Sequence, residues 1–240
     1  MSLLEAENVS MFFGAMAALS DVSITLARGE ILGIIGPNGS GKTTMFNVMV
    51  GKYRPGRGKV IFDGRDITGY PTHAVCRLGL VKTAQIVQPF TSMSVRENVW
   101  VGGLYGRAQS LAEARRSAAE ILEFVGLSDV ARRPAGSLTV AMRRRLELAR
   151  ALATGPKVIL LDENMAGLTP TEIEKVLELL REINRLGVSL MVVEHIMQAV
   201  VGISHRVVAL DYGEKICEGP PGEVLSDKRV CEAYLGDHYA

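Results

Sequence analysis

A glycine-rich segment that follows a short apolar run constrains the fold of this chain more than any other feature. Residues 31–35 are Ile-Leu-Gly-Ile-Ile, which predicts a buried strand, and a helix is expected to begin near Lys42. Between them the chain matches the pattern Gly-x-x-x-x-Gly-Lys-Thr. The matching residues, with one further threonine, are Gly36, Pro37, Asn38, Gly39, Ser40, Gly41, Lys42, Thr43 and Thr44.

This order of strand, loop and helix predicts a nucleotide-binding site. The glycines let successive backbone N–H groups turn toward one point, where they bind phosphate oxygens at the start of the helix. Lys42 is expected to reach the β- and γ-phosphates, and the Thr43 hydroxyl is expected to bind Mg²⁺. A flexible Gly-rich turn is the alternative interpretation, which the flanking strand and helix disfavour.

Composition favours a globular domain from a reducing compartment. The 240 residues are 48% hydrophobic, which is enough for one substantial core or two modest subdomains. Three cysteines without a Cys-x-x-Cys pair argue against a disulfide framework or a zinc site. A formal net charge of +1 gives no basic footprint for nucleic acid. Neither a signal peptide nor a membrane span is visible, so we expect a cytoplasmic protein that reaches a membrane only through a partner.

Strand patterns occur on both sides of a long helical stretch. Residues 22–26 alternate as in a strand, and residues 60–62 lead into Asp63-Gly64, a strong hairpin signal. These early strands are therefore expected to be antiparallel. Buried strands of a parallel sheet are expected at residues 158–161, 190–193 and 207–210.

The whole chain, residues 1–240, is expected to form one domain with two parts. Capping boxes that begin at Ser94 and Ser110 open helices, and the pattern stays helical to about residue 153. We therefore predict an α/β fold, a P-loop (RecA-like) core with an antiparallel β subdomain and an inserted helical subdomain. The β subdomain and nucleotide-binding core are assigned to residues 1–85 and 154–240, and the helical subdomain to residues 86–153.

Two acidic residues follow the apolar run 158–161, at the edge where α/β sheets bind ligands. Asp162 is placed to bind Mg²⁺, directly or through water, and Glu163 is the candidate general base for the water that attacks the γ-phosphate. Helix capping or surface solvation explains such a pair about as often when it stands alone. Downstream of a phosphate loop, the catalytic interpretation is favoured.

His195 and Gln85 are two further candidates for the same site. His195 follows the expected strand 190–193 and should emerge at the same edge of the sheet as Asp162, where its imidazole can hydrogen-bond the γ-phosphate or the attacking water. Gln85 precedes the helical part, and its amide can contact both Mg²⁺ and that water. A structural role is the ordinary explanation for either residue alone.

The order of these motifs resembles the ATP-binding-cassette (ABC) ATPases over essentially the whole chain. In that family an aromatic residue near the amino terminus stacks on adenine, and Phe13 is the matching position, with Phe12 as the weaker alternative. Gln85 matches the family's glutamine loop, and His195 matches its switch histidine. The acidic pair is in the family's order as well.

One family motif departs from its usual pattern. Where the family has Leu-Ser-Gly-Gly-Gln, this chain has Leu-Thr-Val-Ala-Met at residues 138–142. The resemblance implies that Thr139 keeps a hydroxyl that contacts the γ-phosphate of ATP on the opposite subunit. Ala141 adds a Cβ where glycine permits close approach, and Met142 cannot donate the hydrogen bonds of glutamine. Thr169 also replaces the acid that is usual in the loop after the acidic pair.

Residues 162–170 and the ending Ala233-Tyr234-Leu235-Gly236 look most like the ATPases of branched-chain amino-acid importers. The resemblance implies an ATP- and Mg²⁺-dependent ATPase that dimerises head to tail with an identical or related subunit. It would drive a separate membrane permease at the inner face of the plasma membrane, served indirectly by a substrate-binding protein. An exporter ATPase of the lipopolysaccharide type, a non-transport ABC ATPase, and a P-loop GTPase or kinase are the alternatives.

Overall fold

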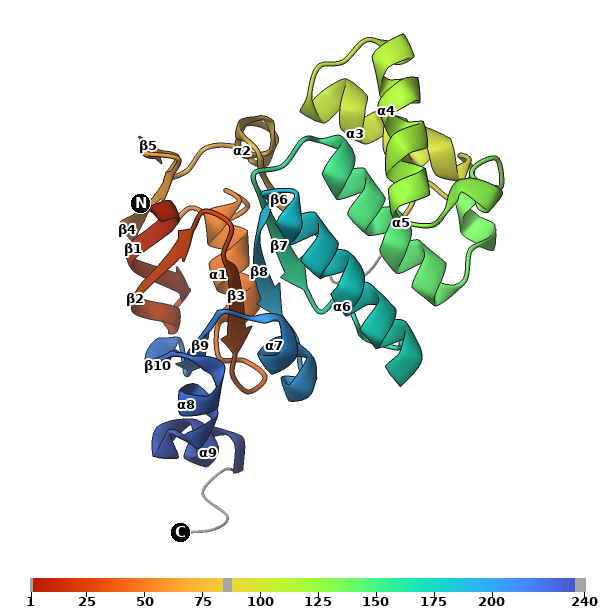
Figure 1. The fold of residues 1–240 in the computed structure, drawn as a ribbon. Helices are drawn as coiled ribbons and strands as arrows, with labels where there is room; N and C mark the ends of the chain where they lie inside the picture. Colours follow the sequence, from red (N-terminus) through yellow and green to blue (C-terminus); the bar gives the residue numbers. More distant parts are fainter. Residues whose placement is uncertain (1, 84–87, 236–240) are drawn as a thin grey trace.

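A six-stranded sheet forms the centre of the molecule (Figure 1). The computed structural model describes residues 2–83 and 88–235, and of Leu235 it describes the backbone only. All neighbouring strands of this sheet are parallel except β10, which runs antiparallel to β9 at one edge. In spatial order the strands are β10 (Glu214–Gly219), β9 (Arg206–Asp211), β3 (Ile31–Ile35), β8 (Ser189–Val193), β7 (Val158–Asp162) and β6 (Leu80–Lys82).

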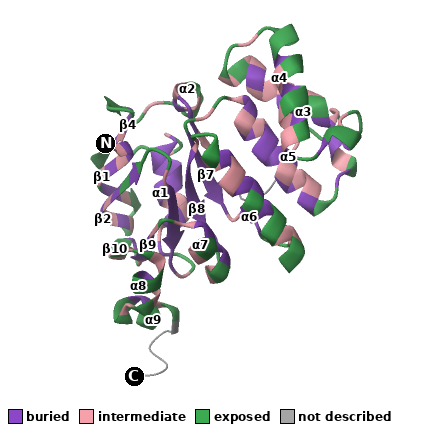
Figure 2. Ribbon diagram, in the orientation of Figure 1, coloured by how far each residue is buried: buried purple, intermediate pink, exposed green. Residues whose placement is uncertain are grey.

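Both faces of this sheet are covered, so its central strands are apolar without alternation. Every residue of β3, β7 and β8 is buried, as Figure 2 shows in purple. On one face Leu160 and Met191 pack in a core with Phe46 of helix α1 (Lys42–Met49) and with the second sheet. On the other face Ile159 and Leu190 pack in a core with helices α5 (Val140–Ala153) and α6 (Pro170–Arg185). The predicted core strands and the α/β fold are thus confirmed.

The second sheet is antiparallel and four-stranded, in the order β2-β1-β4-β5. Its strands are β1 (Ser2–Phe13), β2 (Met16–Ala27), β4 (Arg57–Phe62) and β5 (Arg65–Asp66). Asp63 and Gly64 both have positive φ, 52° and 76°, and join β4 to β5 as the hairpin that the sequence predicts. Strand β1 was not predicted, although it pairs with both β2 and β4 and so holds this sheet together.

Helix α5 and the two α-helices that precede it in the chain, α3 (Val95–Gly106) and α4 (Leu111–Phe124), form a group at one end of the molecule (Figure 1). Both predicted capping boxes are present, since Ser94 caps α3 and Ser110 caps α4. Short 3-10 turns at Ser128–Val130 and Ala135–Ser137 lead from α4 into α5. The predicted subdomain boundaries stay a prediction, because one of them falls at residues 84–87, outside the described part of the chain.

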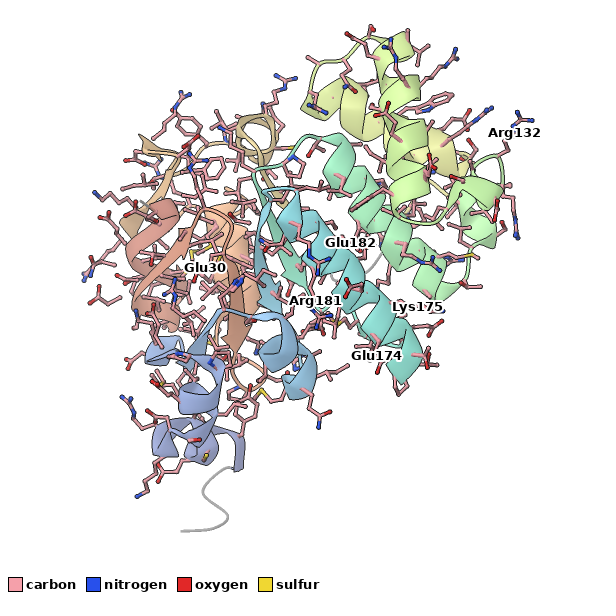
Figure 3. The ribbon with its side chains drawn as sticks, in the orientation of Figure 1. Glu30, Arg132, Glu174, Lys175, Arg181 and Glu182 are labelled. Atoms are coloured by element: carbon pink, nitrogen blue, oxygen red, sulfur yellow. The ribbon has the colours of Figure 1, made fainter. Side chains whose placement is uncertain are left out.

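The remaining helices pack around the central sheet. Glu174, Lys175, Arg181 and Glu182 follow the outer side of α6 in Figure 3, while Leu180 and Ile183 on its inner side are fully buried.

Cys76, Cys217 and Cys231 are free thiols. Among the helices of residues 2–83 and 88–235, none combines the length and the apolarity that a membrane span requires. The other helices are α2 (Thr72–Leu78), α7 (Met197–Ile203), α8 (Pro221–Ser226) and α9 (Lys228–Leu235).

Gly33, in the middle of β3, lets helix α7 approach the sheet closely. A Cβ added there would lie 2.5 Å from Cγ1 of Val200 and 2.7 Å from the Ser204 hydroxyl oxygen. Such distances are below van der Waals contact, so any larger residue forces the helix away from the strand. Glycine in this strand is therefore explained by packing rather than by a turn.

We expect Gly33→Ala to lower the free energy of unfolding by about 1 to 3 kcal/mol, because the added methyl overpacks the contact with α7. Val200→Ala should offset part of this loss, so that the double variant is less destabilised than the sum of the two single changes. Urea unfolding of the four proteins gives this coupling. Gly202→Ala is the matched control, since its added Cβ has nothing within 4 Å; strict additivity of Gly33→Ala and Val200→Ala would contradict the packing argument.

Candidate functional site

The carboxyl ends of β3, β7 and β8 meet at one edge of the central sheet, and the glycine-rich loop leaves β3 there. Gly36 has φ +148°, and a Cβ on it would lie 2.1 Å from the Leu210 carbonyl oxygen. Gly41 has φ +100°, and a Cβ on it would lie 2.7 Å from the Ala18 carbonyl oxygen. Only glycine fits either position, so the loop is held tightly between β9 and β2.

Lys42 is folded into this loop. Its ammonium donates hydrogen bonds to the carbonyl oxygens of Gly36 and Pro37, each at 2.7 Å, and the residue is only 6% exposed. Burial lowers the pKa of Lys42, while the nearby carboxylates of Glu163 and Asp162 oppose this shift. The loop thus holds one buried positive charge at the start of α1, where phosphate groups bind in sites of this form.

The carboxylate of Asp162 is fully buried at the end of β7. Thr43 donates its hydroxyl to Oδ1 of Asp162 at 3.3 Å, and the Lys82 ammonium lies 2.9 Å from Oδ2. A hydroxyl and a carboxylate side by side are the oxygen ligands that Mg²⁺ takes from proteins, the rest coming from phosphates and water. Among the described residues no cluster of three or more His, Cys, Asp or Glu gathers around a metal position.

Glu163 and His195 lie together beside the loop. His195 Nε2 is 2.8 Å from Glu163 Oε1. The Glu163 backbone has φ +52° and donates its N–H to the Val193 carbonyl at 2.9 Å, so β7 and β8 stay joined beyond their last paired residues. A glutamate held in the left-handed region is uncommon, and such strain gathers at functional sites. The structure therefore brings these two candidates to one edge, and their catalytic roles stay a prediction.

A cavity of about 480 Å³ connects the loop to the antiparallel sheet. Phe13 is 42% exposed on its rim, with its ring edge-on to Tyr53 at 5.4 Å between centroids. Phe12 does not line the cavity, which favours Phe13 of the two aromatic candidates. The exposed side chains of Met16 and Tyr212 also reach the rim and were not predicted. The full lining is Phe13, Met16, Ala17, Ala18, Asn38, Gly39, Ser40, Gly41, Lys42, Thr43, Thr44, Glu163 and Tyr212.

Among the predicted residues that the structure describes, Thr139 is one that does not line this cavity. Gln85 lies outside the described residues. Thr139 is exposed at the start of α5, where its hydroxyl accepts the Met142 N–H at 3.3 Å and caps the helix. Ala141 is buried within the helical part of this chain, whereas Val140 is 55% exposed.

A buried polar group behind the site was not predicted. Glu194 is 3% exposed and accepts the Met165 N–H at 2.7 Å, which fixes the loop after Glu163. Burial raises the pKa of Glu194 to about 7, while the hydrogen bond from Met165 and the charge of Arg144 on α5 oppose the shift. The one sequence feature that could have indicated a role for Glu194 is its position directly after an apolar strand. The same holds for Lys82, which ends β6.

A glycine-rich loop with a buried lysine at a helix start, next to a strand-end acidic pair, defines a P-loop nucleoside triphosphatase. Comparison with known proteins identifies the family within this class of nucleoside triphosphatases. A family model described as ABC transporter matches residues 19–166, and one described as branched-chain amino acid ATP-binding cassette transporter matches residues 214–240. The chain belongs to the ABC transporter ATP-binding family, and it is an ATPase that serves an ABC transporter.

Relatives and solved structures match over the whole length. The high-affinity branched-chain amino acid transport ATP-binding protein LivG of Salmonella typhimurium is 38% identical, with 98% of each chain covered. The lipopolysaccharide export system ATP-binding protein LptB of Acidithiobacillus ferridurans is 35% identical, covering 99% of this chain and 98% of its own. The crystal structure of the ADP conformation of MJ1267, an ABC transporter cassette, has a TM-score of 0.90 at 33% identity, covering 99% of this chain and all of its own.

Glu194 makes a pH-dependent contribution to stability. The pKa of Glu194 is higher in the folded protein than the usual 4.5, so folding favours the protonated carboxyl. The contribution of Glu194 to the free energy of unfolding is therefore fully present below about pH 4.5 and is lost as the pH rises through about 7. Glu194→Gln keeps an acceptor for Met165 without the buried charge. We expect the variant to match the wild type near pH 5 and to be more stable by about 2 to 3 kcal/mol at pH 8.

Urea unfolding at both pH values measures this difference. Glu174→Gln, on the exposed side of α6, makes the same chemical change without burial and should show no such trend. An equal effect of Glu194→Gln at pH 5 and pH 8 would contradict the assignment.

Proposed function

We propose that this ATPase hydrolyses ATP in the cavity beside Lys42 and powers import of branched-chain or other amino acids by a separate membrane permease. The observation that carries the import proposal is the match of the C-terminal residues 214–240 to the branched-chain amino acid cassette model. Relatives named for branched-chain amino acid transport, such as LivG, support it.

The nucleotide would lie across the cavity from Phe13 to Glu163. Adenine stacks on the exposed ring of Phe13, whose position is supported by its contact with Tyr53. The phosphates meet backbone N–H groups of residues 38–44 and the Lys42 ammonium. Thr43 and Asp162 hold Mg²⁺, with Gln85 as a further ligand predicted from the sequence, and bound Mg²⁺ neutralises charge on the transferred phosphate.

Glu163 acts as the general base in this proposal. Its carboxylate accepts a proton from water as the water oxygen attacks the γ-phosphorus and the bond to the bridging oxygen breaks. His195 lies 2.8 Å from that carboxylate, and with ATP bound its imidazole hydrogen-bonds the γ-phosphate or the attacking water. Positioning and charge neutralisation supply the catalysis, because the phosphoryl group needs no covalent intermediate on the protein.

A second ATPase subunit would complete each site. Thr139, at the amino end of α5, is exposed and does not line this chain's own cavity, so in a head-to-tail dimer it is available to ATP on the opposite subunit. Val140 is the exposed side chain there, and its branched bulk restricts close approach more than the buried Ala141 does. The partner is an identical or a related ATPase, and the pair docks on permease subunits at the cytoplasmic face, with a substrate-binding protein on the other side.

Lipopolysaccharide export is the second candidate function. LptB matches this chain at 35% identity over almost its whole length, close to the identity with LivG. Overall sequence identity therefore does not distinguish an import ATPase from an export ATPase. The match of residues 214–240 to the branched-chain amino acid cassette model favours import.

Glu163→Gln keeps the shape of the side chain but removes the base, so we expect ATP turnover to fall at least about 100-fold while ATP binding survives. Lys42→Ala should instead weaken binding severely, since the phosphates lose their buried cation. Steady-state turnover and titration with a fluorescent ATP analogue separate the two effects. Glu174→Gln is the matched control and should leave both unchanged; near-normal turnover in Glu163→Gln would exclude Glu163 as the base.

Transport is tested in cells that produce the Glu163→Gln variant as their only form of this chain. Uptake of labelled leucine, isoleucine and valine should fall to the level of cells without the protein, because the permease has lost its energy source. Normal uptake of all three, together with a surface depleted of lipopolysaccharide, would instead support export.

A further inference from the structure

The side chain of Tyr234, in the C-terminal helix α9, contacts the phosphate loop. The hydroxyl of Tyr234 accepts a hydrogen bond from the backbone N–H of Gly36 at 2.6 Å, across 198 positions of sequence. Helices α8 and α9 lie together at the lower end of the molecule in Figure 1, beyond the strand edge where the loop leaves β3. Tyr234 belongs to the segment that the branched-chain amino acid cassette model matches, and none of the roles above uses it.

Gly36 is the residue through which this contact acts on the loop. It follows the last residue of β3, and its Cα has no room for a side chain beside the Leu210 carbonyl. Its own carbonyl oxygen accepts a hydrogen bond from the Lys42 ammonium at 2.7 Å. Gly36 is therefore held between the Tyr234 hydroxyl on one side and the Lys42 ammonium on the other.

Helix α9 is anchored well enough to present its tyrosine in a fixed place. Val224 of α8 and Val230 of α9 are buried in a small core with Ile35 and Ala209 of the central sheet. At the bend between the helices, the Asp227 carboxylate accepts hydrogen bonds from the backbone N–H and the guanidinium of Arg229, both at 2.9 Å. The hydroxyl of Tyr234 is thus tied to the same strand, β3, that carries the loop.

The rest of α9 stands off from the loop. A cavity of about 490 Å³ lies between them, lined on the helix side by Arg229, Glu232 and Ala233 and on the loop side by residues 37–40. Tyr234 is itself 43% exposed, so its side chain contributes little to the core and its hydroxyl bridges the gap. A contact of this kind sets the position of the loop rather than the stability of the fold.

We propose that Tyr234 is a positioning residue for nucleotide binding, which holds Gly36 so that the loop N–H groups and Lys42 converge on the phosphates. The proposal rests on the phosphate loop being the nucleotide site, as argued above. Losing the hydroxyl leaves the Gly36 N–H to solvent and frees the start of the loop. ATP then binds a looser loop, while the catalytic edge formed by Glu163 and His195 keeps its own contacts.

The test is Tyr234→Phe in the full chain, which removes only the hydroxyl. We expect the KM and the dissociation constant for ATP to rise about 3- to 10-fold, the size of effect that one hydrogen bond supports, with turnover at saturating ATP within about 2-fold of wild type. Amide exchange measured by NMR should become faster at Gly36 and stay unchanged at Ile34, inside β3. The thermal midpoint of unfolding should stay unchanged.

Tyr70→Phe is the matched control, because it also removes a hydroxyl that accepts a hydrogen bond, here from Arg65 of strand β5 at 3.0 Å. It should leave ATP affinity and Gly36 exchange unchanged. Unaltered ATP affinity in Tyr234→Phe, or an equal loss in Tyr70→Phe, overturns the proposal.

Lys42→Ala, measured in the same titration, separates this proposal from the function on which it rests. Loss of binding in Lys42→Ala with normal binding in Tyr234→Phe rejects the role of Tyr234 alone. Normal binding in Lys42→Ala rejects the phosphate-loop site, and with it both proposals.

Discussion

The buried carboxylate of Asp162 organises the site around it. A charge with no exposure to water is tolerated only where other groups satisfy it, because desolvation costs more than a surface pair gains. Here the Lys82 ammonium comes from β6 and the Thr43 hydroxyl from the first turn of α1. The end of β7, the neighbouring strand and the helix that follows the phosphate loop are thereby fixed relative to one another. The position of the candidate base Glu163, the next residue, is fixed by the same contacts.

Features with a local signal could be predicted from the sequence, and features that depend on distant contacts could not. The phosphate loop, the acidic pair and the capping boxes at Ser94 and Ser110 are short patterns whose chemistry acts within a few residues. Strand β6 is only three residues long, so Lys82 carried no periodicity that would place it beside Asp162. The Tyr234 hydroxyl lies next to Gly36 only because α8 and α9 fold back onto β3, which no local pattern encodes.

The departures from family pattern have local structural roles in this chain. Thr169 replaces an acid, yet its hydroxyl and backbone form a capping box with Glu172 that starts α6. Thr139 caps α5 through its hydroxyl alone, which accepts the Met142 N–H. Ala141 is buried whereas Val140 is 55% exposed, so in the proposed dimer Val140 is the bulkier exposed neighbour of Thr139. Of these positions, only the exposed ones are available to a neighbouring subunit.

The hydrogen bonds of Lys42 to the carbonyls of Gly36 and Pro37 make nucleotide binding an exchange of partners. An arriving phosphate competes with two backbone oxygens for the same ammonium, so its affinity is the difference between two sets of charge-assisted bonds. Without a phosphate, the buried ammonium is satisfied by these two carbonyl oxygens. Selectivity for triphosphates then depends on what lies beyond the loop, at the ends of β7 and β8.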